Sequence, residues 1–178
     1  MKTGALQSFL HGTTPADLGP GPRAGVTPLP DLNHALNDAF ASAHLTGTQA
    51  DLVRATLLLW HDHHDAAHRI VQDMDTPDGS YIHAILHRRE PDFFNAKYWF
   101  RRVGQHPCFS ELTARTADIL RKSSPESLVK KLLPHGTWNS FAFVDSCEAA
   151  ASPSAPTHET LREIQQAEFE VLLDHLCR

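Results

Sequence analysis

Apolar residues recur every three or four positions over most of the chain after Asp31, and alternating strand patterns are almost absent. This spacing places the apolar side chains on one face of a helix, and that face is buried when helices pack together. A half-buried strand needs an apolar residue at every second position. The sequence therefore predicts an all-α protein, packed as an irregular bundle of seven or eight helices.

The first 30 residues have a different character. The strings GPGP at 19–22 and PLP at 28–30 cannot propagate a helix, because proline lacks an amide proton and fixes φ. We expect an irregular arm over 1–30, which is either mobile or packed over the body. Residues 31–178 are expected to form a single helical domain, since a chain of 178 residues is long enough for one core.

Capping and turn residues divide this domain into expected helices. Asp31 and Asp92 are good N-caps, Ser124 before Pro125 is another, and the string TPDG at 76–79 is a strong turn signal. The expected helices cover about 32–44, 48–74, 80–89, 93–103, 110–122, 125–133, 139–150 and 157–176.

Composition excludes several classes of protein. The net charge of −5 does not favour nucleic-acid binding, and no apolar run approaches the roughly 20 residues of a membrane span. The N-terminus lacks the basic and apolar segments of a secretory signal. The three cysteines are far apart and form no C-x-x-C pair, which fits small apolar fillers in a reducing, cytoplasmic compartment.

Histidine is the unusual residue, with 13 in the chain. His61, His64 and His68 would form one stripe if 48–74 is a single helix, because each residue advances about 100°. His83 and His87 are one turn apart on the next helix, and the turn between the helices makes them antiparallel neighbours.

Two histidines at i and i+4, with a ligand from a facing helix, can hold zinc, iron or manganese. We predict that His68, His83 and His87 ligate a divalent transition metal and leave a position open for water or substrate. Glu90 and His64 are the candidate catalytic or auxiliary groups. The alternative is a set of partly buried histidines bonded to carboxylates such as Asp62.

The segment 87–104 is basic and aromatic. It contains five Lys or Arg against two acids, and five of the chain's fourteen aromatic residues. Arginine binds carboxylates and phosphates through paired hydrogen bonds. The segment therefore predicts a site for a small anionic ligand, formed by Arg88, Arg89, Asn95, Tyr98, Trp99 and Arg101. The alternative is that the arginines pair with nearby acids and the aromatic side chains fill the core.

The strings WHD at 60–62, HRREPD at 87–92 and NAKYWFRRVG at 95–104, together with His68 and His83, resemble a family of all-helical proteins of bacteria and fungi that have no assigned activity. The resemblance is strong over about 45 residues. It implies that this block is the hallmark of the family, and it implies no particular metal.

Two functions follow from these patterns, and a third possibility is a protein whose only role is assembly through its helices. One is a metal-binding protein, as a metal-dependent enzyme or a binder, with an anionic ligand beside the metal. The other is a metal-free helical module that binds an anionic metabolite or an acidic peptide. The chain has no H-E-x-x-H motif, no phosphate-binding glycine loop and no nucleophile elbow, so common hydrolase and nucleotide-binding classes are not indicated.

Overall fold

The computed structural model describes residues 2–12, 14–123 and 125–178. These residues form ten α-helices, one short 3-10 helix and no strand, so the all-α prediction is confirmed. The elements are α1 (Lys2–His11), α2 (Leu29–Ala43), α3 (Gly47–Trp60), α4 (His64–Val71), α5 (Pro77–Arg89), α6 (Phe93–Val103), α7 (Cys108–Ser123), α8 (Glu126–Leu132), η1 (Pro134–Gly136), α9 (Ser140–Ala149) and α10 (His158–Leu176).

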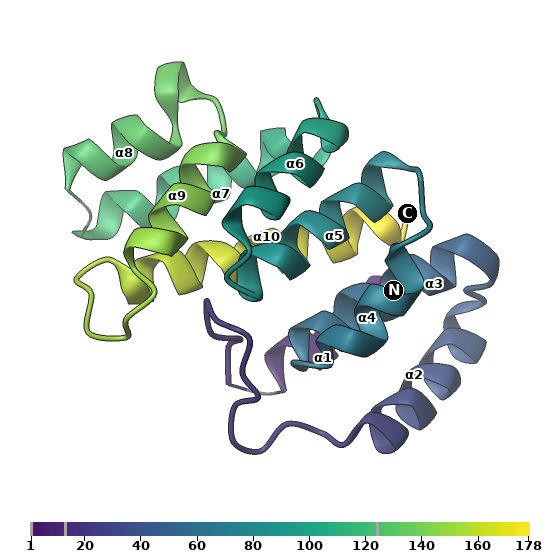
Figure 1. Ribbon diagram of the computed structural model, residues 1–178. Helices are drawn as coiled ribbons and strands as arrows, with labels where there is room; N and C mark the ends of the chain where they lie inside the picture. Colours follow the sequence, from purple (N-terminus) through teal and green to yellow (C-terminus); the bar gives the residue numbers. More distant parts are fainter. Residues whose placement is uncertain (1, 13, 124) are drawn as a thin grey trace.

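The helices form two groups that share α10. In Figure 1, α1 to α4 lie on one side and α7 to α9 on the other, with α5, α6 and α10 between them. The apolar core follows this arrangement. Phe169 and Leu172 of α10 pack into the core of the first group, whereas Leu161 and Ile164 pack into that of the second. The last helix therefore joins the two groups through its buried face.

The N-terminal arm is not irregular throughout, and this part of the prediction was wrong. Residues 2–11 form α1, in which Leu6 and Leu10 are buried one turn apart. Gln7 Nε2 donates to the Glu170 carbonyl at 3.1 Å and so anchors α1 on α10. Beyond α1, the described residues 12 and 14–28 contain no helix, as the prolines predicted. The arm is packed over the body, because α1 lies against α10 and buries both leucines.

The expected helix over 48–74 is two helices, α3 and α4. Together with α1, this break explains why the described part of the chain has ten α-helices where seven or eight were expected. The chain turns at Asp62, whose φ of 63° is left-handed. The Asp62 carboxylate accepts from the Arg23 amide at 2.9 Å and from the Arg23 and Arg89 guanidinium groups at 2.8 Å and 2.6 Å. A Cβ on Gly21 would lie 2.7 Å from Asp62 Oδ2, so glycine lets the arm approach this carboxylate. The break between α3 and α4 is therefore held by contacts with distant segments.

Several helix ends agree with the sequence. Asp92 caps α6 by accepting from the Asn95 amide at 3.2 Å, and Gly104 with a φ of 62° ends that helix. Asp31 instead lies in the first turn of α2, which begins at Leu29 after Pro28. The expected cap at Ser124 lies outside the described residues.

The three cysteines are buried and free, as expected of apolar fillers. Among the described helices, none combines the length and the apolar character that crossing a membrane requires.

Candidate metal centre

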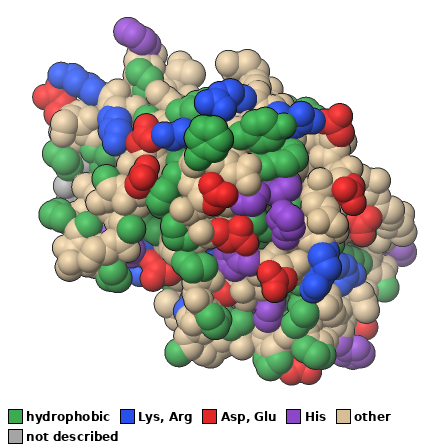
Figure 2. All heavy atoms as spheres, in the orientation of Figure 1, with side chains coloured by type: hydrophobic (Ala, Val, Ile, Leu, Met, Phe, Trp, Pro, Cys, Tyr) green, Lys and Arg blue, Asp and Glu red, His purple; other side chains and the backbone are tan. Residues whose placement is uncertain are grey.

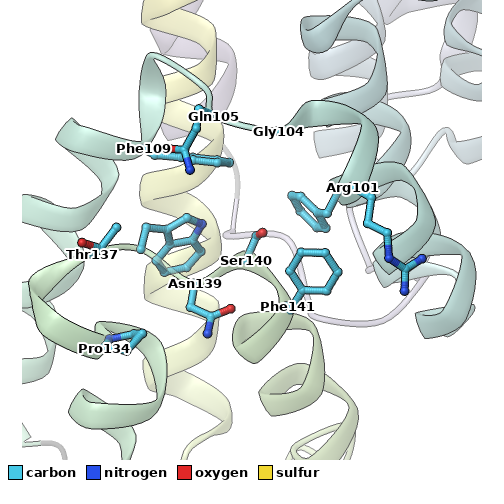
Figure 3. Close-up of a pocket in the computed structure, with 11 residues that line it drawn as sticks. Arg101, Gly104, Gln105, Phe109, Pro134, Thr137, Asn139, Ser140 and Phe141 are labelled. Carbon is cyan, nitrogen blue, oxygen red and sulfur yellow. The ribbon is translucent and has the colours of Figure 1, made fainter.

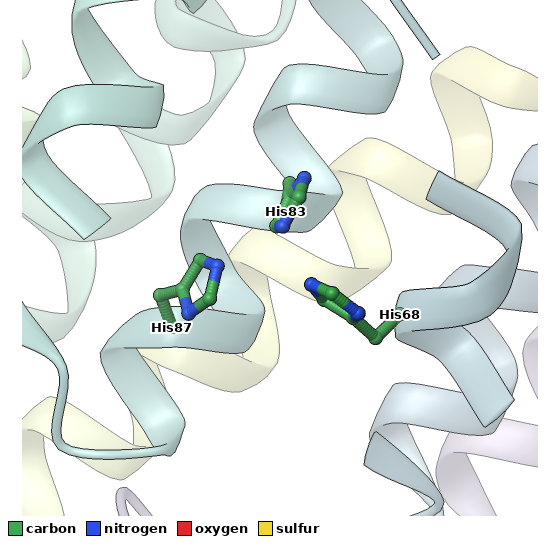
Figure 4. Close-up of side chains that lie close together, drawn as sticks. All are labelled: His68, His83 and His87. Carbon is green, nitrogen blue, oxygen red and sulfur yellow. The ribbon is translucent and has the colours of Figure 1, made fainter. Parts of the chain in front are cut away.

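His68 of α4 and His83 and His87 of α5 lie together, as Figure 4 shows. One ring nitrogen from each residue lies within 4.8 Å of the others. Ligands bound to one ion at about 2.0–2.1 Å lie no more than about 4 Å apart. Small side-chain rotations would therefore bring the three nitrogens to metal-ligand distance. We call these three residues the histidine triad.

Ring packing fixes the orientation of the triad. His83 stacks on Trp99 with ring centroids 3.9 Å apart and planes 19° apart, and on His87 at 4.7 Å and 22°. The His68 ring stands nearly perpendicular to His83, at 82°. Two rings thus come from one rigid helix and the third approaches from the facing helix.

Burial favours the neutral form of the two α5 histidines. It lowers the pKa of His83 to about 3, with smaller contributions from His87 and His68. Burial also lowers the pKa of His87, with Asp92 opposing it. A neutral imidazole has a free lone pair, which is the form that binds a metal ion.

Two side chains lie close to His87. Asn95 Nδ2 is 3.1 Å from His87 Nε2. Glu90 Oε2 is 3.2 Å from His87 Nδ1, within ion-pair distance but without the geometry of a hydrogen bond. A carboxylate beside the second nitrogen of a ligating histidine is a common means of orienting the ring. The position of Glu90 fits this role better than that of a free base. Its pKa is raised by partial burial, which Asp65 and Asp92 reinforce and His68 opposes.

The buried Nδ1 atoms of His83 and His87 have no hydrogen-bond partner among the described residues. A buried polar atom without a partner costs stability, so such atoms call for an explanation. For His83 Nδ1 a bound metal ion is one explanation, whereas His87 Nδ1 lies beside the Glu90 carboxylate.

His64 does not join the triad. It begins α4, and its Nδ1 lies 3.2 Å from the backbone oxygen of Asp62. Because the chain breaks at Asp62, the expected stripe of His61, His64 and His68 on one helix is not formed. His61 instead bonds the Phe9 carbonyl at 3.1 Å.

Arg88 and Arg89 lie in the interior, and both side chains are fully buried. Arg88 makes a paired contact with Glu168 of α10 at 2.5 Å and 3.2 Å. Arg89 binds Asp62 and three backbone carbonyls, those of Asp17, Leu59 and Gly19. Apart from Arg88 Nε, which has no partner among the described residues, these guanidinium nitrogens bond to protein acceptors. A ligand would therefore have to displace a buried carboxylate.

The remaining predicted ligand-binding residues lie on α6, but they face different surroundings. Asn95 and Trp99 contact the triad, whereas Tyr98 is 45% exposed. Arg101 is exposed, with its guanidinium 5.8 Å from the Phe141 ring. Figure 2 shows histidine and acidic side chains gathered near the centre of the face on which α5 and α6 lie, with hydrophobic and basic side chains above them.

A second cluster with metal-ligand chemistry was missed by the sequence analysis. Asp78 Oδ1 lies 2.9 Å from His106 Nε2 and 3.0 Å from His175 Nε2. These three residues, here called the aspartate clasp, come from the start of α5, the segment before α7 and the end of α10. No sequence signal connects them, since they are far apart in the chain.

Hydrogen bonds within the protein already explain why the residues of the aspartate clasp lie together. The Cys108 amide donates to His106 Nδ1 at 3.3 Å, so that nitrogen carries the lone pair and Nε2 carries the proton. His106 then donates to Asp78, and this bond lowers the pKa of Asp78. A metal-ligating histidine normally donates from its second nitrogen instead of accepting there. The aspartate clasp is therefore a link between three segments rather than a metal site.

Comparisons with protein-family models, with curated proteins and with solved structures gave no match to this chain. The resemblance at residues 60–104 accordingly stays a prediction.

Proposed function

We propose that the histidine triad binds one divalent transition metal ion and that the ion keeps a position open for water or a small anion. The observation that supports this most strongly is the convergence of three ring nitrogens, within 4.8 Å, from two facing helices. Three imidazoles suit zinc and iron better than manganese, which prefers oxygen ligands. Zinc is thus the first ion to test.

The charge of the ligands indicates what the centre could do. Three neutral imidazoles leave both positive charges of the ion uncompensated. Such an ion attracts anions and lowers the pKa of a bound water, as in hydrolytic zinc sites with three protein ligands. We propose water activation toward a small anionic substrate as the chemistry of this centre, with Glu90 orienting His87.

Metal analysis tests the binding. Protein purified without a nickel resin should contain about one equivalent of a transition metal, or take up one equivalent of zinc in a titration after chelation. The His83→Leu/His87→Leu double variant should lose this binding. The matched control replaces two exposed histidines, His11→Ala/His34→Ala, and should bind as the parent does. Equal zinc binding by both double variants would contradict the proposal.

Cobalt substitution tests the open position. A cobalt-loaded triad should absorb in the visible range, and azide should change that spectrum by entering the coordination sphere. A spectrum that azide leaves unchanged would indicate a closed, structural site, and the proposed water activation would then be wrong.

A further inference from the structure

A cavity of about 460 Å³ opens between the C-terminal end of α6 and the start of α9, as Figure 3 shows. No residue of the histidine triad lines it. Its volume falls in the range of about 300–1,000 Å³ that is usual for small-molecule sites. The metal proposed above does not account for this cavity.

Aromatic side chains form much of the wall. Phe100, Phe109, Trp138 and Phe141 line the cavity. Phe100 is 2% exposed and Trp138 6%, so both rings are fixed by the core beneath them. Aromatic rings pack best against flat apolar groups, through offset-stacked or edge-to-face contacts. The walls therefore suit a ligand with a planar apolar body.

All the polar side chains around the cavity can donate hydrogen bonds, and one of them is a cation. Arg101 supplies a cation, and no Asp or Glu is among the described lining residues. Asn139 Oδ1 accepts from the Ala142 amide at 3.0 Å, so the amide Nδ2 of Asn139 remains as a donor. The first backbone N–H groups of α9 lack acceptors within the helix and carry its positive dipole end.

Trp138 contributes its ring to the wall, and its indole nitrogen has no surface open to the cavity. Its indole N–H is buried and has no acceptor among the described residues. Arginine, amide and helix N-terminus together favour a ligand that accepts hydrogen bonds and carries negative charge. A carboxylate meets both conditions.

We propose that this cavity binds a small aromatic monocarboxylate, with its ring against the aromatic wall and its carboxylate near Arg101 and the start of α9. The inference does not depend on the metal centre, because the lining residues and the triad do not overlap.

Benzoate is the probe for the test, titrated into metal-free protein in the presence of EDTA. Indole N–H signals in two-dimensional NMR separate Trp138 from Trp60 and Trp99. Benzoate should shift the Trp138 signal in a saturable way, and benzamide, its neutral analogue, should bind about tenfold more weakly, because hydrogen bonds to a charged group are the stronger ones.

Two exposed arginines on α6 give a matched pair of variants. Arg101→Gln removes the cation at the cavity and should weaken benzoate binding about tenfold. Arg102→Gln removes a neighbouring cation that pairs with Asp75 and does not line the cavity, so it should leave benzoate binding unchanged. Phe141→Ala, in the aromatic wall, should weaken binding of benzoate and benzamide alike.

Three results would overturn the inference: no saturable shift at Trp138, equal binding of benzoate and benzamide, or equal losses in the two arginine variants. The His83→Leu/His87→Leu variant should bind benzoate as the parent does. If that variant loses zinc binding and still binds benzoate, the two sites are independent of each other. A failure of the benzoate site can then be told apart from a failure of the metal centre.

Discussion

The histidine triad and the aspartate clasp contain similar chemical groups and differ in how those groups are satisfied. In the aspartate clasp, one carboxylate accepts from two histidines and a backbone amide fixes the tautomer of His106. In the histidine triad, two ring nitrogens are buried without hydrogen-bond partners. Residue type and proximity alone do not separate the two clusters.

Under the proposal that the histidine triad binds a metal, unmet bonding capacity distinguishes the two clusters where the list of ligand types does not. A satisfied cluster stabilises the fold as it stands, because its hydrogen bonds already compensate burial. An unsatisfied one costs stability until something binds. The predictions below test this contrast, in order of decreasing effect on stability.

The largest loss is expected from Asp78→Ala. The substitution leaves the Nε2 donor of His106, whose side chain is 1% exposed, without its acceptor. We expect a loss of about 2–3 kcal/mol, since hydrogen bonds to charged groups contribute about 1.5–3 kcal/mol. For a domain of this size the melting temperature should fall by roughly 5–10 °C.

Zinc should not change that loss. Asp75→Ala is the matched control, because Asp75 is a nearby acid with its side chain 87% exposed, and its loss should change stability by less than about 0.5 kcal/mol. If zinc restored the Asp78→Ala variant, or if both variants melted alike, the clasp would not be the structural link described here.

Acid should destabilise the protein through buried histidines, whose pKa values are lowered, and at lower pH also through Asp78. Burial lowers the pKa of His64 to about 4 from its ordinary value of 6.5. Between these two pH values the unfolded chain binds a proton at His64 and the folded chain does not, so protonation favours unfolding. The stabilising contribution of neutral His64 is therefore complete above about pH 6.5 and is lost as the pH falls toward 4. The pKa of Asp78 is lowered by its bond from His106, so its contribution persists until the pH falls below the ordinary value of 3.8.

Melting temperatures measured from pH 8 to pH 3 check this separation. His64→Leu should make the profile less steep between about pH 6.5 and 4, with the remaining slope due to His61, His83 and His87. Asp78→Ala should make it less steep only at lower pH. His34→Ala, at an exposed histidine, should leave the shape unchanged. A His64→Leu profile as steep as that of the parent would contradict the assignment.

A smaller effect is expected from His83→Leu in metal-free protein. Leucine removes a buried nitrogen without a partner but also the stacking on Trp99, so stability should change by less than about 1.5 kcal/mol in either direction. Its zinc response should nevertheless disappear. Zinc at 100 times its dissociation constant should stabilise the parent by about 2.7 kcal/mol and raise its melting temperature by roughly 5–10 °C.

The smallest effect on stability is expected from Glu90→Gln. The Glu90 side chain is 34% exposed and has no hydrogen bond to His87, so the melting temperature should change by less than about 2 °C. Zinc affinity should still fall about tenfold, because a carboxylate next to a ligating histidine orients the ring. Unchanged zinc affinity would show that Glu90 does not position His87.

Local patterns predicted much of this architecture. The helical periodicity predicted the all-α class, and Asp92 and Gly104 predicted both ends of α6. His83 and His87 share a face because helix geometry alone puts i and i+4 together. The approach of His68 followed from the chain reversal between α4 and α5. The sequence predicted that reversal at 76–79, but the structure places it before Pro77, because Thr76 caps α5 by accepting from the Gly79 amide.

The long-range contacts could not be predicted in the same way. Asp62 ends the expected helix because Arg23 and Arg89, distant in sequence, bind its carboxylate. Arg88 resembled an anion-binding residue until its buried partner, Glu168, was placed beside it by α10. The free energy of a buried charge depends on what packs against it, and a linear pattern does not contain that information.

The sequence by itself determined the helical class, most helix boundaries and the grouping of three histidines on two adjacent helices, because each depends on the spacing of neighbouring residues. Only the tertiary structure decided which polar groups are satisfied. It paired Arg88 and Arg89 with buried carboxylates and joined Asp78 to two distant histidines. It also left the Nδ1 atoms of His83 and His87 without hydrogen-bond partners. Hydrogen bonding and burial are properties of atoms in contact, and those contacts form only when the helices pack.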